Sequence, residues 1–155
     1  MAELSRPPIP APMGAQNLAA LLRAGFLAID SLATARVVER FSDLRPAFAP
    51  VITNIDDGGT RVTELARRTG LTKPSVVYLV DEMEGLGYLE RIPDPEDGRA
   101  KLVKPTARAL AAVELGRREI AAIEAEWTSA LGEEAIAGMR ATLEELRVRL
   151  WSPHP

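Results

Sequence analysis

The charged side chains in the middle of the chain are sorted by sign, and the basic ones suit the binding of phosphate groups. Basic residues fall in two groups, at 61–73 and at 99–104, and a cluster of carboxylates at 81–84 lies between them. A phosphate backbone attracts positive charge that is gathered on one face of a protein. The segment 59–105 holds as many acidic as basic residues, so the sequence predicts only a modest basic surface.

Other chemistries find little support in the residue types. The chain has no Cys, and its single His, His154, lies between two prolines, so thiolate and histidine sites for metals or catalysis are not expected. The neighbouring acids Glu96 and Asp97 fit a solvated loop. Glu133 and Glu134 fit a helix N-terminus, where negative charge is favourable. We therefore expect no enzyme activity and no cofactor.

Length and composition indicate the class of protein. A chain of 155 residues suits one domain, or one domain with an appended module. No apolar run is expected to reach the length of a membrane span, and no signal-peptide pattern opens the chain. The net charge of −3 does not by itself indicate nucleic acid. These features predict a soluble cytoplasmic protein with no membrane partner.

Two predicted helices position the basic residues. Thr63 is expected to cap a short helix over 64–69, and Gly70 is expected to provide the turn that follows. Thr72 is expected to cap a second helix, whose first turn tolerates Pro74. An apolar stripe at helical spacing predicts the buried side chains of this second helix, namely Val76, Leu79, Val80 and Met83.

A β-hairpin is predicted after the second helix. Its strands span 88–92 and 101–103, and Asp97 with Gly98 is expected to form a two-residue turn with positive φ at the tip. Asp97 is also expected to hold the guanidinium of Arg99 in a salt bridge. A single hairpin is too small to be stable alone, so it must pack against the helices.

Two helices followed by a hairpin form a helix-turn-helix with a wing. The second helix of such a motif enters the major groove of DNA, and a wing arginine such as Arg99 can reach the minor groove. Arg67 and Arg68 equally suit the negative end of the first helix dipole, and Ser75 equally suits a helix cap. The candidates for contact with double-stranded DNA are Arg61, Arg68, Thr72, Lys73, Pro74, Ser75, Val77, Tyr78, Asp97, Arg99 and Lys101.

Further helices flank this motif, so the predicted fold class is mainly α with a small β-hairpin wing. Apolar residues spaced by three and four predict long helices over 15–41, 106–129 and 133–151. A shorter helix is expected over 45–55, with a kink or a late start at Pro50. The long helices have little of their own chain to cover them, so a second copy of the protein is expected to do so in a homodimer. The predicted organisation is a disordered Pro-rich arm (1–13), a helical dimerisation region (14–42 and 106–152) and a winged helix-turn-helix DNA-binding domain (43–105).

One segment resembles the DNA-binding core of the MarR (multiple antibiotic resistance regulator) family of bacterial transcription factors. It reads VTELARRTGLTKPSVVYLVDEMEGLGYLERIPDPEDGRAKLVKPT, residues 62–106. The resemblance implies a homodimer on a pseudo-two-fold DNA site, a dimer interface built from the first and last helices, and often a small-molecule pocket. The most specific matches are Leu65-Ala66 with Gly70-Leu71, Val80-Asp81 with Met83-Glu84 and Gly87, and the Asp-x-Arg of Asp97 and Arg99.

Two departures from the family pattern lie in this segment. The family commonly has a polar residue and then an arginine where this chain has Val77 and Tyr78. These side chains either cover a neighbour and the rim of the motif, or contact thymine methyl groups and a phosphate or base edge. Pro105 stands where the family usually has a different apolar residue, and it should only sharpen the start of the next helix.

These features predict a ligand-responsive repressor that binds a pseudo-palindromic operator as a homodimer and responds to a small organic effector. The alternative is a winged-helix module that binds proteins instead of DNA, which the balanced charge of 59–105 and the Val77–Tyr78 pair also fit. Four apolar residues are candidates for an effector cleft, although they equally suit ordinary core, namely Phe26, Ile29, Phe48 and Ile52.

Overall fold

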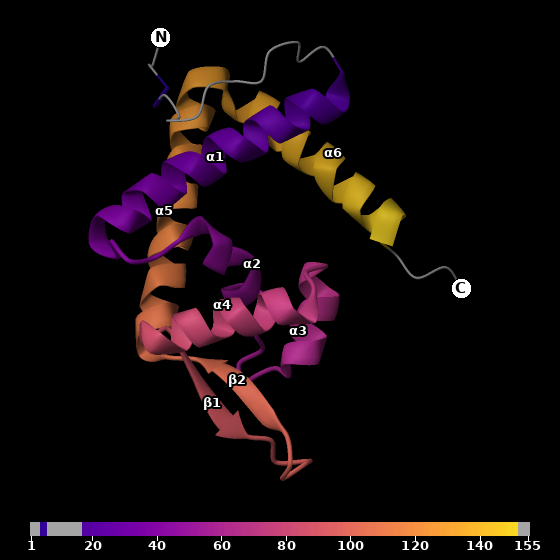
Figure 1. Cartoon of the computed structure of the whole chain (residues 1–155). Coiled ribbons are helices and arrows are strands. Elements are labelled where there is room, and N and C mark those ends of the chain that lie inside the picture. Colours follow the sequence, from indigo (N-terminus) through magenta and orange to yellow (C-terminus); the bar gives the residue numbers. More distant parts are fainter. Residues whose placement is uncertain (1–3, 6–16, 152–155) are drawn as a thin grey trace. The chain divides into compact units, whose positions relative to one another are not determined.

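The computed structural model describes residues 4, 5 and 17–151 of the chain (Figure 1). The Pro-rich arm expected over 1–13 lies outside the described residues except for residues 4 and 5, and His154 also lies outside them. The predicted fold class is confirmed, because the described residues are mainly helical and carry one two-stranded sheet.

Two compact units make up the chain. We call residues 34–118 the winged-helix unit, and the described residues of 1–33 and 119–155 the helical unit. Their boundaries fall inside long helices, whereas the sequence suggested boundaries between elements. The elements in order are α1 (Leu18–Arg40), the 3-10 helix η1 (Pro46–Phe48), α2 (Ala49–Ile52), α3 (Val62–Thr69), α4 (Lys73–Gly85), β1 (Leu89–Pro93), β2 (Lys101–Pro105), α5 (Ala107–Leu131) and α6 (Glu133–Trp151).

The segment predicted as one helix over 45–55 forms two shorter pieces, η1 and α2. Each piece has a proline in its first turn, where a backbone N–H has no helical partner to lose. The late start expected at Pro50 is therefore confirmed. The helix ends earlier than predicted because the side chains of Thr53 and Asn54 bond back to carbonyls of the preceding turn, at 2.7 and 2.8 Å.

The first helix of the helix-turn-helix begins earlier than predicted. Thr63 does not cap it, because α3 starts directly after Arg61, which is the N-cap residue. The reason lies in a contact that is distant in sequence. Thr60 pairs with Val103 of β2 through two backbone hydrogen bonds of 2.9 Å, and the chain turns into α3 immediately after this bridge.

The turn and the second helix follow the prediction. Gly70 ends α3 with a φ of 70°, a left-handed conformation that favours glycine. Thr72 caps α4, and its side chain accepts a hydrogen bond from the backbone N–H of Ser75 at 3.2 Å. The predicted apolar stripe of α4 is buried along its length: Val76, Leu79, Val80 and Met83.

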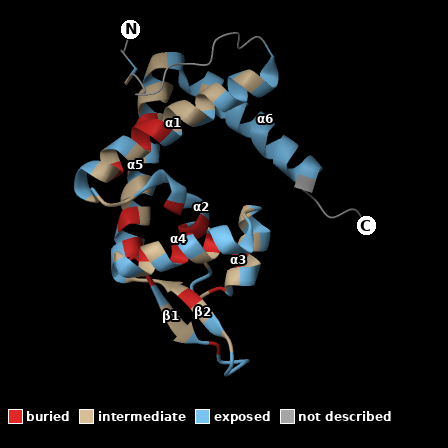
Figure 2. Cartoon of the chain, in the orientation of Figure 1, coloured by how far each residue is buried: buried red, intermediate tan, exposed pale blue. Residues whose placement is uncertain are grey.

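This stripe lies in the core of the winged-helix unit (Figure 2). Fully buried side chains from the other elements surround it, among them Val51 of α2, Leu65 of α3 and Val103 of β2. Burying one large apolar side chain contributes about 1.5–3 kcal/mol to stability. The hairpin is thus held by the helices, as the sequence required.

The wing is the antiparallel hairpin of β1 and β2, but its tip differs from the prediction. Neither Asp97 nor Gly98 has a positive φ, so the expected two-residue turn is wrong. A longer loop replaces it, in which the Asp94 N–H bonds to the Ala100 carbonyl at 3.1 Å. The cause is the side chain of Asp94, which accepts a hydrogen bond from the N–H of Glu96 at 2.9 Å. This bond turns the chain away from strand pairing directly after β1.

The helical unit has a small core of its own. Leu32 and Ala33 of α1 are buried against Ile123 of α5, and Ile29 and Trp127 pack beside them. Helix α6 is exposed over most of its length (Figure 2). The large apolar side chains that α6 exposes are Met139, Leu143, Leu146, Val148 and Leu150.

Helix α1 corrects one expectation from composition. By length and composition alone it could cross a membrane, although no apolar run was expected to be long enough. Only two charged residues, Arg23 and Asp30, lie among residues 18–35 of this helix, so its mean hydropathy is high. A helix that packs against other helices has the same composition, and Leu32 packs in this way. One such helix therefore does not indicate a membrane protein.

Candidate nucleic-acid interface

The first turn of α4 presents a polar surface to solvent. Lys73, Pro74 and Ser75 are all exposed there. The hydroxyl oxygens of Thr72 and Ser75 lie 2.7 Å apart, which supports the interpretation of Ser75 as part of the helix cap. The Lys73 amine forms no ion pair with any residue that the structure describes. A cation at a helix N-terminus is unfavourable, so Lys73 does not stabilise the helix that it begins.

The next turn of α4 carries the two residues that depart from the family pattern. Tyr78 is 62% exposed and stands three residues after Ser75, on the same face of the helix. Val77 is half-buried at the edge of this face. The structure thus exposes Lys73, Ser75 and Tyr78 along the first two turns of α4.

Arg45 joins this surface, although the sequence did not single it out. It is the N-cap residue of η1, and its guanidinium donates to the carboxylate of Glu82 on α4. The Glu82 carboxylate, and after it the Tyr78 hydroxyl, raise the pKa of Arg45. The partners are 37 positions apart in the chain, so no local pattern could have indicated the pair.

The tip of the wing carries a second group of exposed cations. Arg99 and Lys101 are exposed, and neither side chain forms an ion pair within the part of the chain that is described. The predicted salt bridge between Asp97 and the Arg99 guanidinium is wrong. The Asp97 carboxylate instead accepts the backbone N–H of Arg99 at 3.1 Å, because it turns back onto its own loop.

Arg61 lies at the base of the wing. Its guanidinium donates to the Asp94 carboxylate at 2.6 Å and lies 4.0 Å from Asp97. Asp94 is 5% exposed, and the N–H of Glu96 together with Arg61 lowers the pKa of its carboxyl. Arg61 therefore ties the wing loop to the start of α3, and its half-exposed side chain keeps access to solvent.

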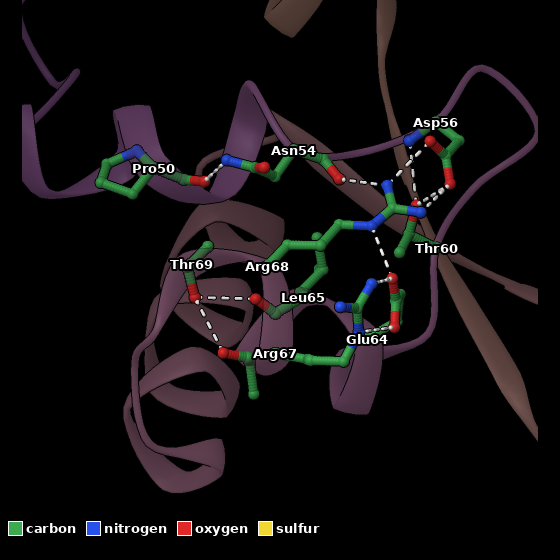
Figure 3. A network of polar contacts seen from close by, with 10 residues as sticks. Pro50, Asn54, Asp56, Thr60, Glu64, Leu65, Arg67, Arg68 and Thr69 are labelled. Atoms are coloured by element: carbon green, nitrogen blue, oxygen red, sulfur yellow. Dashed lines mark hydrogen bonds and ion pairs between the residues drawn. The ribbon is translucent and has the colours of Figure 1, made fainter. Parts of the chain in front are cut away.

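Arg68 is engaged within the protein, as Figure 3 shows. Its guanidinium donates to both carboxylate oxygens of Asp56, at 2.8 and 2.9 Å, and to Glu64 at 2.8 Å. It also donates to the Asn54 carbonyl at 3.0 Å. Hydrogen bonds from Arg67 and then Arg68 lower the pKa of Glu64 to about 2. This network favours a structural role for Arg68, which anchors the loop before α3.

A second arginine that the sequence did not single out is Arg91 of β1. Its guanidinium donates to Asp81 and to Glu84, both on α4. Arg91 therefore links the wing to the helix that carries Tyr78. The acidic cluster at 81–84 was visible in the sequence, but its partners come from other elements.

The winged-helix unit matches a known family. Residues 42–100 fit the family model described as the MarR family. The chain carries a MarR-family domain. The resemblance expected from the sequence is thus confirmed. No curated protein matches the chain.

Solved structures of MarR-family regulators resemble a larger part of the chain. Transcriptional regulator Tm0710 from Thermotoga maritima is 29% identical, with a TM-score of 0.67 over 86% of this chain and 96% of that one. MarR from E. coli in its apo form is 22% identical, with a TM-score of 0.69 over 84% and 96%. CouR from Rhodococcus jostii RHA1, bound to p-coumaroyl-CoA, is 21% identical, with a TM-score of 0.65 over 90% and 96%. The family consists of transcription regulators and not of enzymes.

The four residues expected to line an effector cleft fall in different units of the chain. Phe48 and Ile52 are buried in the core of the winged-helix unit, because their short helices pack under α4. Phe26 and Ile29 lie in the helical unit, in an open apolar groove of about 770 Å³ between α1, α5 and α6. The core interpretation therefore holds for Phe48 and Ile52.

Proposed function

We propose that the chain regulates transcription by binding double-stranded DNA as a homodimer. The observation that carries the proposal is the exposed polar face of α4, where Lys73, Ser75 and Tyr78 stand together on the second helix of a MarR-family helix-turn-helix. That helix is the one that enters the major groove. Such a regulator acts in the cytoplasm, where the DNA is.

The candidate residues divide by the kind of contact they can make. Lys73, Arg99 and Lys101 are unpaired among the described residues, so their charge is available to phosphates and to the narrow minor groove. Val77 offers methyl groups to thymine, and the Tyr78 hydroxyl can bond a base edge. At the start of the helix, Thr72 offers its backbone and Pro74 offers an apolar ring for contact with DNA. Phosphate contacts set the register and base contacts set the specificity.

A homodimer would cover the apolar surface that the helical unit leaves open. The groove is lined by Leu22 and Phe26 of α1 and by Met139, Leu143 and Leu146 of α6, all of them exposed in the single chain. Exposed apolar patches of this kind mark protein–protein contacts. A two-fold dimer would place its two recognition helices about one DNA turn apart, roughly 34–36 Å.

In this proposal the protein represses transcription while it is bound to DNA, and a small organic effector releases it from the DNA. CouR, which shares this fold, was solved with p-coumaroyl-CoA bound. An effector that releases DNA must bind the DNA-incompetent form more tightly. Release of the protein from DNA by peroxide or zinc, with no effect of aromatic acids, would contradict an organic effector.

The first experiment measures the salt dependence of DNA binding. The unmodified chain is titrated against a duplex selected from a random-sequence pool and against a scrambled duplex. Arg99→Ala and Lys73→Ala should each weaken binding to both duplexes and lower the slope of log K against log salt by about one. Arg68→Met serves as the control, and its salt slope should match that of the unmodified chain because Arg68 is paired internally.

The second experiment separates base contacts from phosphate contacts. Tyr78→Ala and Val77→Ala should weaken binding to the selected duplex by about 1–3 kcal/mol and leave the scrambled duplex nearly unchanged. If the unmodified chain binds neither duplex at low salt, the protein-binding alternative replaces the proposal. If Arg99→Ala binds both duplexes as the unmodified chain does, the wing is a solvated hairpin.

A further inference from the structure

The second half of α4 has a charge that opposes DNA binding. Lys73 is the only basic residue of this helix, whereas Asp81, Glu82 and Glu84 all lie in its C-terminal half. Carboxylates near a helix C-terminus face the negative end of the helix dipole. On a helix that approaches DNA they would also face phosphates. Three unpaired carboxylates there would therefore weaken both the helix and the proposed complex.

Each of these carboxylates is paired with an arginine from outside the helix. One guanidinium nitrogen of Arg91, on β1, donates a hydrogen bond to the Asp81 carboxylate and another donates to the Glu84 carboxylate. The Arg91 side chain is only 23% exposed. Arg45, the N-cap residue of η1, donates to Glu82. Arg45 precedes α4 in the sequence and Arg91 follows it, and both guanidinium groups pair with the C-terminal half of this helix.

We propose that Arg45 and Arg91 are positioning residues for DNA binding, which offset two of the three negative charges on α4 so that this helix can approach the phosphates. The proposal rests on the proposed function. Neither arginine needs to contact DNA itself, because both guanidinium groups are committed to carboxylates. The three carboxylates are in turn explained as anchors that hold η1 and β1 against the recognition helix.

The test uses pairs of variants of the full chain and a mixed-sequence duplex at low salt, because charge cancellation does not depend on DNA sequence. Arg91→Ala should weaken binding about fivefold, the upper end of the range for a surface ion pair. Adding Asp81→Asn and Glu84→Gln to Arg91→Ala should restore affinity to within about twofold. Asp81→Asn with Glu84→Gln alone should bind more tightly than the unmodified chain, with a steeper salt dependence.

The same logic applies to the second pair. Arg45→Ala should weaken binding, and Arg45→Ala with Glu82→Gln should recover it. Arg117→Ala is the matched control, because Arg117 pairs with Glu114 on α5 at 3.3 Å and its loss changes the net charge equally. The control should bind the duplex as the unmodified chain does.

The outcomes separate this inference from the function on which it rests. If the unmodified chain does not bind the duplex, the proposed function and this inference both fail. If the unmodified chain binds but the amide substitutions do not restore the affinity of Arg91→Ala, charge cancellation is wrong. Urea unfolding of each variant measures its stability. If the loss of DNA affinity follows only the loss of folded protein, the arginines have a purely structural role and the inference is overturned.

Discussion

The two units of the chain bury their apolar side chains in different ways. The winged-helix unit encloses a core in which Phe48, Leu65 and Tyr88 have no exposed surface. The helical unit has a core of only a few residues around Ile123, and it leaves most of α6 open to solvent. One unit is therefore complete within a single chain, whereas the other offers an apolar surface that needs a partner.

This difference explains why the same kind of sequence signal has two meanings. Apolar residues at helical spacing in α4 mark a core inside the chain, and those in α6 mark a surface that the chain itself does not cover. The pattern alone cannot separate these cases, because both give an apolar stripe on one face. The number of elements available to cover the stripe decides which case applies.

Phe48→Ala should have the largest effect on the stability of the winged-helix unit. Phe48 is fully buried, so its truncation removes apolar contacts and leaves a cavity, at a cost of about 3–5 kcal/mol. Urea unfolding followed by circular dichroism measures the loss. Phe26→Ala is the matched control from the helical unit. Phe26 is 63% exposed in the single chain, so the same truncation should cost far less at a protein concentration low enough to keep the chain monomeric, and an equal cost there would contradict the comparison.

Leu143→Asp should dissociate the proposed dimer. A charge placed on the open face of α6 would be buried without a partner in the assembly, and self-association should weaken at least about a hundredfold, or about 2.7 kcal/mol. Sedimentation at micromolar concentration measures the change in mass. Ala141→Asp adds the same charge on another face of α6, away from the groove, and should leave the mass unchanged. A compact monomer for the unmodified chain would contradict the dimer itself.

Local signals in the sequence predicted the helix-turn-helix well. Thr72, Pro74 and the apolar stripe of α4 act within one or two turns, so their effects were visible in the order of residues. The C-terminal glycine of α3 is another local signal, since Gly70 adopts the left-handed conformation that ends the helix. The proposal that Lys73 and Tyr78 contact DNA also follows from this register, because both lie in the first two turns of α4.

Contacts between distant residues account for what the sequence did not predict. Thr60 pairs with Val103 and moves the start of α3, and Asp94 bonds Arg61 and opens the tip of the wing. Arg68 was predicted as a possible phosphate contact. Its guanidinium instead donates to groups of this chain, two of which, the Asn54 carbonyl and the Asp56 carboxylate, precede α3. Each of these outcomes depends on the folded geometry and not on a local pattern.

The winged-helix unit also includes a polar anchor that joins the ends of two long helices to its core. The buried Tyr88 donates its hydroxyl to Asp43, just after α1, at 2.7 Å. Arg108, in the first turn of α5, donates to the same carboxylate at 2.8 and 2.9 Å and lies over the Tyr88 ring at 4.3 Å. This anchor supports the placement of both helix ends in the winged-helix unit.

Tyr88→Phe should give the smallest effect, a loss of about 0.5–1.5 kcal/mol of unfolding free energy for one hydrogen bond, because the ring and its packing remain.

Burial, and then the bond to Asp43, raise the pKa of Tyr88 from 10.0 to about 12. The folded state therefore favours the protonated hydroxyl. Its contribution is fully present below pH 10.0 and is lost as the pH rises towards about 12. Urea unfolding across this range should show a decline that Tyr88→Phe lessens. Tyr78→Phe, at the exposed tyrosine, should retain the decline, and equal behaviour of the two variants would contradict the anchor.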